Sequence, residues 1–358
     1  MFHSLFEVLR RQGTFDTILA TVILFITVLT AISLTFALMA IFFRVANVQK
    51  ASLWKKLESE WDPLMRRVLS GESDTKELLA AVEREHELYF INYLARYSRR
   101  FVGDIRKKIV AFAEPFLSRV VSGLTHSDPE RRARAVQTLA ILGGEKYVGE
   151  IAKSLTDSSP LVAMVAARAL ASEKRVDYVD SILSQLTKFR TWNRSYLVSM
   201  LVMMGADAGA SLRNVYRDER KPHSERALAA NALAELLDFS AADSACEFLS
   251  TETNPDIVSA SLRLLASVGR KEHLPSIRDL CASNNAVVRS HALTALGNIG
   301  DVEDRELLAI GFEDKSIWVA LHAAWALKAA GAGDLLAKIT TTGHPRADLA
   351  KQVLVEKI

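Results

Sequence analysis

Cysteine is almost absent from the sequence. Only Cys246 and Cys281 occur, and neither belongs to a CxxC pair or lies near a cluster of cysteine and histidine. This scarcity argues against a framework of disulfides. Two isolated thiols are typical of small buried core residues in a protein of a reducing compartment.

Proline and glycine are also scarce, and neither sign of charge dominates. The 358 residues include 8 prolines and 16 glycines, and 49% are hydrophobic. This composition favours a helical protein over a β-sandwich, which needs more turn residues. The formal net charge is only +3, so the chain as a whole gives no electrostatic indication of nucleic-acid binding.

Short motifs of catalytic and nucleotide-binding sites are missing as well. The sequence has no Walker loop, dinucleotide fingerprint, HExxH or GxSxG. The charged string Glu83–Glu87 has one histidine and lacks the second that a zinc protease needs. We therefore predict no catalytic residues, no metal site and no cofactor, and we expect that the chain is not an enzyme.

One long apolar run lies near the N-terminus. No charged residue occurs between Asp16 and Arg44. As a helix, residues 17–43 would be roughly 40 Å long, more than the hydrocarbon core of about 30 Å. A signal peptide is the alternative, but its apolar region is shorter and ends at a cleavage site of small residues. The run therefore predicts a transmembrane helix in contact with membrane lipid.

Basic residues follow this run more densely than they precede it. They are Arg44, Lys50, Lys55 and Lys56. The excess places the C-terminal bulk in the cytoplasm and leaves residues 1–16 as a short extracytoplasmic tail. Within the run, Thr27, Ala31 and Thr35 fall on one helical face, where small side chains allow another helix to pack. These residue types are also common in transmembrane helices without any such role.

Residues 44–114 are amphipathic and charged, and they predict a helical neck. We expect helix breaks near Pro63 and Gly71. The stretch 96–108 is basic, with tyrosines beside it. It would contact anionic lipid headgroups or, the interpretation we favour, form a solvated helix face.

From residue 115 to 358 the chain repeats with a period of 31 or 32 residues. The leucines of this repeat are Leu139, Leu170, Leu201, Leu233, Leu265, Leu296 and Leu327. A mostly small residue lies four positions before each leucine, and glycine lies four positions after five of them. This pattern predicts a helix, a turn and a second helix per unit, with the units stacked because one hairpin cannot bury its own apolar face.

One unit, Asn285–Gly300, closely resembles the HEAT-like repeat of phycobilisome lyases and many bacterial scaffold proteins. The resemblance extends over residues 115–341 and weakens in the third and fourth units. It implies an α-solenoid of about seven HEAT-like hairpins. Together with the transmembrane helix predicted over residues 17–43, this gives an all-α fold class. The resemblance also implies an interaction surface and does not carry over lyase chemistry.

The whole layout resembles bacterial proteins with one membrane helix, a Trp-x-Pro neck and HEAT-like repeats. The neck motif is Trp61-Asp62-Pro63 in this chain. Such proteins often accompany membrane glycosyltransferases that make secreted polysaccharides. The resemblance implies a bacterial inner-membrane location and a glycosyltransferase partner in exopolysaccharide synthesis.

Two further side-chain types recur at fixed repeat positions. His291 and His322 occupy equivalent positions in consecutive units, so we expect them to lie side by side. We expect them to form a surface or groove contact rather than a metal site. Arginine recurs three positions before the small residue, at Arg132, Arg194, Arg226 and Arg289. We expect these arginines to pair with acidic residues of neighbouring turns and to hold the register.

The helix face away from the core predicts the binding groove of the solenoid. A solvated face should be charged, yet this one is largely apolar and aromatic. Its candidate partner-binding residues are Leu161, Val165, Trp192, Arg194, Tyr196, His291, Trp318, His322 and Trp325. There are two alternatives to this groove. The helix face that points away from the core could be assigned one position off, or the terminal helix could cover Trp318 and Trp325.

Taken together, these patterns predict a non-catalytic, membrane-anchored scaffold that binds a protein partner in its concave groove. One alternative is a HEAT-like lyase or another enzyme whose site is assembled from scattered residues. Another is nucleic-acid binding through Arg190, Arg194, Arg213 and Arg217, which we consider unlikely beside the balanced charge.

Overall fold

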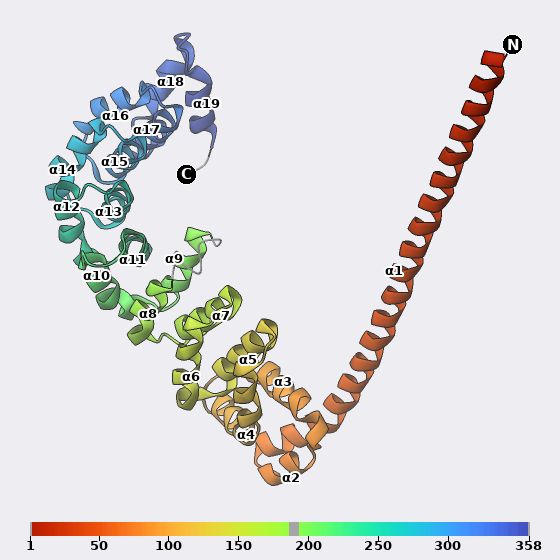
Figure 1. Ribbon diagram of the computed structural model, residues 1–358. Coiled ribbons are helices and arrows are strands. Elements are labelled where there is room, and N and C mark those ends of the chain that lie inside the picture. The colour runs from red at the N-terminus through yellow and green to blue at the C-terminus, as the bar shows by residue number, and fades with distance from the viewer. Residues whose placement is uncertain (1, 186–192, 357–358) are drawn as a thin grey trace. The chain divides into compact units, whose positions relative to one another are not determined.

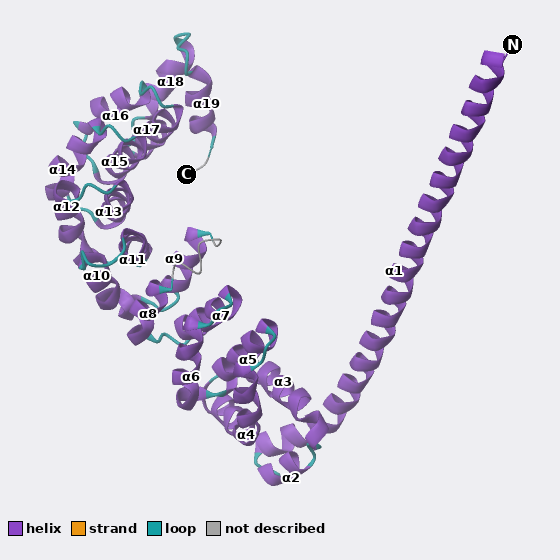
Figure 2. Cartoon of the chain, in the orientation of Figure 1, coloured by secondary structure: helices purple, strands orange, loops and turns teal. Residues whose placement is uncertain are grey.

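The computed structural model describes residues 2–185 and 193–356, with side chains from residue 22 onward. All the regular secondary structure in these residues is helical, which confirms the predicted all-α class (Figure 2). The chain divides into two compact units, Met1–Phe112 and Ala113–Ile358. Each unit is described by itself.

The first unit is built on one exceptionally long helix, α1 (Phe2–Ser70), which contains the predicted membrane segment and continues into the neck. From Val22 onward, α1 is long and apolar enough to cross a membrane, and none of the residues in its most apolar window is buried against the rest of the chain. A helix from the core of a soluble protein would be covered on at least one face. This apolar stretch has no such cover among the residues that the structure describes.

The helix break predicted near Pro63 is wrong, because α1 runs through Pro63 and ends at Ser70. A proline inside a helix removes one backbone hydrogen bond. Here the surrounding turns bury Leu57, Trp61, Met65 and Val68 along one face. Burial of four large side chains outweighs that loss. The break predicted at Gly71 is confirmed, with a φ of +84° that suits glycine.

A small aromatic cluster holds the end of α1 against α2 (Thr75–Ala80) and α3 (Glu87–Ser98). The Trp61 ring lies 5.0 Å from Phe90 and 5.6 Å from Tyr93, and the Tyr93 hydroxyl donates to Asp62 Oδ1 at 2.8 Å. Arg96 pairs with Glu58 at 2.5 Å and lies over the Trp54 ring. The first arginine of the basic stretch therefore holds this packing together. Helix α4 (Gly103–Ser122) follows.

The second unit alternates two sets of helices. The leucine-bearing helices are α5 (Pro129–Leu142), α7 (Pro160–Ser172), α9 (Arg194–Val202), α11 (His223–Glu235), α13 (Pro255–Val268), α15 (Ala286–Ile299) and α17 (Ile317–Ala329). The second helices are α6 (Val148–Lys153), α8 (Val179–Ser184), α10 (Gly209–Arg217), α12 (Ala242–Thr251), α14 (Leu274–Asp279), α16 (Asp304–Phe312) and α18 (Gly333–Thr341). A final helix, α19 (Ala347–Val355), packs on α17 and α18. Figure 1 shows α11, α13, α15 and α17 on the inner side of this unit's curve and α10, α12, α14 and α16 on its outer side.

The repeat columns predicted from the sequence form the interior of this unit. All seven leucines are at most 2% exposed, and the residues four positions before them are buried as well. Close helix contact explains why small residues are needed. A Cβ added at Gly297 on α15 would lie 2.5 Å from the Ala326 Cα on α17. The stack is therefore held by apolar burial at short helix-to-helix separation.

The position four residues after each leucine lies at the turn of the hairpin. In the two units without glycine there, the residue at this position has a positive φ. Gly205 and Gly331 take φ values of +80° and +68°. The column lacks glycine at Lys174 and Leu237, and these are the two non-glycine residues with positive φ, both +54°, in the described part of the chain. Four of the seven column positions thus take a left-handed residue, whereas Gly143, Gly269 and Gly300 have negative φ. At Lys174 and Leu237 the left-handed position is filled by a residue with a side chain.

We predict that Leu237→Gly stabilises the protein. Leu237 is 54% exposed, so little packing is lost, while relief of the left-handed strain should add about 1 kcal/mol to the free energy of unfolding. Urea unfolding of the full chain in detergent, followed by circular dichroism, measures the change. Gly331→Ala is the reverse control and should destabilise, because an added Cβ there meets only Arg305 Nη2, at an ordinary contact distance of 3.9 Å, and must take the strained φ. A Leu237→Gly variant no more stable than the parent would contradict this account of the turn.

Candidate partner-binding groove

The predicted groove face is exposed along the inner side of the second unit. Leu161 on α7, Val287 on α15 and Trp318 on α17 are 42%, 48% and 55% exposed. The residue that follows each of them in the chain is buried. The predicted groove positions of α7, α15 and α17 are thus exposed beside a buried neighbour. Val165 on α7 lies on the same face and is half-buried.

Two histidines and a tryptophan form a continuous ring cluster at the C-terminal end of this face. The His291 and His322 rings lie 6.2 Å apart, and the Trp318 ring lies 4.7 Å from His322. The Thr294 hydroxyl donates to Ser290 O at 2.9 Å. Its oxygen is then free to accept the proton of His322 Nδ1 at 3.1 Å, which leaves Nε2 as an acceptor.

Burial keeps both histidines neutral. It lowers the pKa of His291 to about 4, and Arg263 and His322 lower it further in the same direction. Burial also lowers the pKa of His322. At neutral pH this part of the groove is therefore an uncharged aromatic surface.

The residues placed closely enough for metal coordination, within the described ranges, lie away from these histidines. They are Glu83, Glu85 and His86 in one group, and Asp243, Glu272 and His273 in the other. In the second group Arg270 Nη2 already binds Asp243 at 2.8 Å and Glu272 at 2.6 Å. Its carboxylates thus form an ion-pair network without a metal.

The C-terminal helix covers one of the two predicted tryptophans in part. The Lys328 ammonium lies 5.4 Å from the Trp325 ring and donates to the carbonyls of Val353 and Leu354 at the end of α19. Trp325 is accordingly half-buried, whereas Trp318 is open. Trp192 and Arg190 lie outside the described residues, and Tyr196 is half-buried on α9.

The predicted arginine column is confirmed in three units and fails in one. Arg132 binds Asp157 through Nε and Nη2 at 2.8 and 2.9 Å, and Arg289 binds Asp314 in the same way at 2.7 and 3.0 Å. Arg226 is buried and pairs with Glu252 at 2.6 Å. Arg194 makes no such pair among the described residues; its side chain lines the groove instead.

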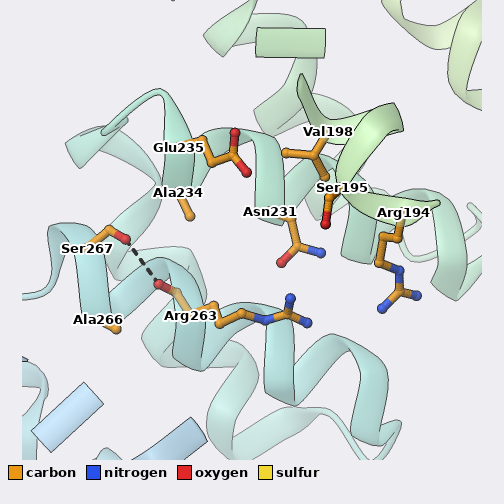
Figure 3. Close-up of a pocket in the computed structure, with 9 residues that line it drawn as sticks. All are labelled: Arg194, Ser195, Val198, Asn231, Ala234, Glu235, Arg263, Ala266 and Ser267. Carbon is orange, nitrogen blue, oxygen red and sulfur yellow. Dashed lines mark hydrogen bonds between the residues drawn. The ribbon is translucent and has the colours of Figure 1, made fainter. Parts of the chain in front are cut away.

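Arg194 opens onto a hollow of 320 Å³ that the sequence analysis did not identify. Ser195, Val198, Asn231, Ala234, Glu235, Arg263, Ala266 and Ser267 line the rest of it. Figure 3 shows the guanidinium groups of Arg194 and Arg263 in the same space, with the Asn231 amide between the two helices that carry them. Asn231 and Arg263 each lie two positions after the small residue of their repeat, a groove position, and this signal could have identified them.

The remaining candidate residues have simpler environments. On α1, Thr27 and Thr35 are exposed and their hydroxyls donate to Ile23 O and Ala31 O at 2.8 Å. Ala31 is exposed beside them, so this small-residue face is free of other described parts of the chain. Of the arginines considered for nucleic acid, Arg213 pairs with Asp238 and Arg217 donates to Ser244.

Comparison with known proteins supports the helical-repeat assignment. Residues 242–328 match the family model for HEAT repeats. No match was found among curated proteins. The complex of CpcE and CpcF of phycocyanin lyase from Nostoc sp. PCC7120 is similar at 19% identity and a TM-score of 0.35, covering 66% of this chain and 86% of that chain.

Two other solved structures have a similar fold. A Kap121p mutant matches at 14% identity and a TM-score of 0.43, and the alignment covers 78% of this chain and 38% of that one. Human deoxyhypusine hydroxylase matches at 15% identity and a TM-score of 0.23, covering 70% and 98%. Likeness at these identities concerns the fold alone.

The prediction that the chain is not an enzyme needs correction. Two of these similar structures carry the names of enzymes, a lyase and a hydroxylase. We expected no enzyme activity because the sequence contains no short catalytic motif. In a stack of helices, however, residues far apart in sequence come together, so a catalytic site needs no short motif.

We predict that His291→Gln flattens the dependence of stability on pH. The unfolded chain takes up a proton below the ordinary histidine pKa of about 6.5, while folded His291 stays neutral down to about 4. The contribution of His291 to stability is thus complete above pH 6.5 and declines as the pH falls toward 4. Thermal unfolding at several pH values in this window should show a smaller loss for the variant than for the parent. The same substitution at the exposed His223 is the control, and equal losses in all three proteins would contradict the prediction.

Proposed function

We propose that this chain is a membrane-tethered HEAT-repeat protein that binds a protein partner in the groove on its leucine-bearing helices. The observation that carries the proposal is the open Trp318 ring, seated against the neutral His322–His291 pair. Aromatic residues exposed on a rigid surface beside apolar neighbours are the usual energetic centres of protein interfaces. Val287 extends the same apolar face to the neighbouring repeat, and Leu161 is exposed on the same face of α7, five repeats away from Trp318.

The proposed tether is the apolar part of α1. A span of residues 17–43 with its positive flank on the C-terminal side would place the repeats in the cytoplasm at a bacterial inner membrane. A tether of this kind raises the local concentration of a membrane partner to the millimolar range, so that a weak groove contact is enough. The face of Thr27, Ala31 and Thr35 would then meet a partner's transmembrane helix.

The layout of membrane helix, Trp-x-Pro neck and HEAT-like repeats supports one class of partner, a multi-pass glycosyltransferase that makes a secreted polysaccharide. The burial of Trp61 explains why the neck needs its tryptophan, since this side chain holds α3 against α1.

Trp318→Ala tests the proposal. We expect this variant to lose the partner in cross-linking of native membranes followed by mass spectrometry, because truncating an interface centre costs about 2 kcal/mol or more, roughly thirtyfold in affinity. Phe239→Ala is the matched control, since Phe239 is an aromatic residue 65% exposed at the turn after α11. Full recovery of the partner with Trp318→Ala, or equal loss with both variants, would contradict groove binding.

A further inference from the structure

Two arginines in the middle of the groove form no ion pair and donate no hydrogen bond from their guanidiniums within the described residues. The hydrogen bonds and ion pairs of the second unit include neither the guanidinium of Arg194 nor that of Arg263, and the Nε of Arg263 is buried without an acceptor. In Figure 3 both guanidiniums reach into the same hollow, Arg194 from the start of α9 and Arg263 from the middle of α13.

A buried amide lies beside this pair. Asn231 on α11 is only 6% exposed, and its Nδ2 has no hydrogen-bond partner among the described residues. It lines the hollow between the two arginines in Figure 3. A buried polar group without a partner is unfavourable by about 1–3 kcal/mol, so native structures seldom keep one without a use for it.

The arrangement is unfavourable in the free protein. Burial lowers the pKa of Arg263, the neighbouring positive charge of Arg194 lowers it in the same direction, and the negative charge of Asp256 opposes them only in part. The other arginines of the repeat column avoid this situation. Arg132 and Arg289 each hold a carboxylate in two parallel hydrogen bonds. What the hollow lacks, therefore, is an anion with the geometry that those aspartates supply elsewhere.

We propose that Arg194, Arg263 and Asn231 form a carboxylate-binding subsite that receives an aspartate or glutamate side chain from an acidic segment of the partner protein. This inference rests on the proposed groove-binding function and names the chemistry that the groove recognises. A carboxylate can accept from both guanidiniums and from the amide at once, which are the charge-assisted bonds that arginine forms most strongly.

The surroundings favour one acidic side chain of a protein over a nucleic-acid strand. The carboxylate of Glu235 lines the same hollow and would repel a second negative charge. Further along the groove, His291 and His322 are neutral and Trp318 and Val287 are apolar. A phosphate backbone needs a row of cations, whereas in this hollow Arg194 and Arg263 form one close pair beside Glu235.

The test uses the full-length protein in detergent and an array of short peptides of random sequence. We expect the parent protein to select peptides with an acidic residue beside apolar residues. The strongest peptide should then bind Arg194→Gln/Arg263→Gln at least about tenfold more weakly. The same peptide with its acidic residue changed to the amide should bind the parent protein at least about tenfold more weakly.

Matched controls separate a specific subsite from general attraction. Arg99→Gln/Arg100→Gln removes two exposed arginines from the first unit and changes net charge equally, so peptide binding should be unchanged. Inorganic phosphate and single-stranded oligothymidine serve as competitors. Stronger competition by either one than by free acetate at the same ionic strength would overturn the protein carboxylate as occupant. Selection of peptides without acidic residues would also overturn it.

A stability measurement distinguishes a variant that has lost peptide binding from one that has unfolded. Arg263→Gln should raise the melting temperature in the absence of peptide, because it removes an unpaired buried charge. Arg289→Gln should lower the melting temperature, because it leaves Asp314 without its partner. A fall with Arg263→Gln would overturn the subsite, since it would mean that Arg263 is already paired.

The outcome also separates this inference from the proposed function. If Trp318→Ala releases the membrane partner and the double arginine variant does not, groove binding is right and the subsite is wrong. If the double variant abolishes selection of acidic peptides while Trp318→Ala retains the membrane partner, the hollow binds carboxylates, but that membrane partner does not depend on Trp318 and the proposed function is wrong.

Discussion

The structure of the second unit depends on the burial of one leucine per hairpin between neighbouring helices. Each leucine-bearing helix is covered by the second helix of its own hairpin and by the helices of the adjacent units. Small residues four positions before the leucine let these helices approach, and the approach at Gly297 leaves no room for a Cβ. These contacts bury the apolar side chains of the helices. The residues on the inner face of the same helices are therefore not needed for packing and can vary. The groove residues occupy that face.

The geometry of the repeat also determines which charged side chains form ion pairs. An arginine three positions before the small residue reaches an acidic residue in the turn about 25 residues further on, as Arg132 and Arg289 do. These pairs are nearly buried and fix the register of neighbouring hairpins. Arg194 occupies the equivalent position and lacks the pair. Arg263, two positions after the small residue of its own repeat, is a second arginine without an ion pair among the described residues. The hollow that these two arginines share with Asn231 is lined by the third, fourth and fifth units, and the repeat pattern is degenerate in the third and fourth.

The helices of the repeat could be predicted from the sequence because period, small residues and glycines all depend on local spacing. The face of Trp318, Val287 and Leu161 followed from the same helical period. Pro63 was misjudged because its effect depends on the side chains that the helix buries around it. The hollow of Arg194, Asn231 and Arg263 was missed because sequence spacing does not tell which charges find partners. The absence of catalytic motifs misled for a similar reason, since a helical stack brings together residues that no short motif records.

Photo-cross-linking in the native membrane tests the central claim most directly. A photoreactive residue at Val287 on α15 probes the groove, and one at Ile310 on α16 probes a second helix, on the outer side of the unit; both positions are exposed. Groove binding predicts a cross-link to another membrane protein from position 287 and none from position 310. A cross-link from position 310 alone, or from neither position while the partner still co-purifies, would show that the groove is not the surface this chain uses.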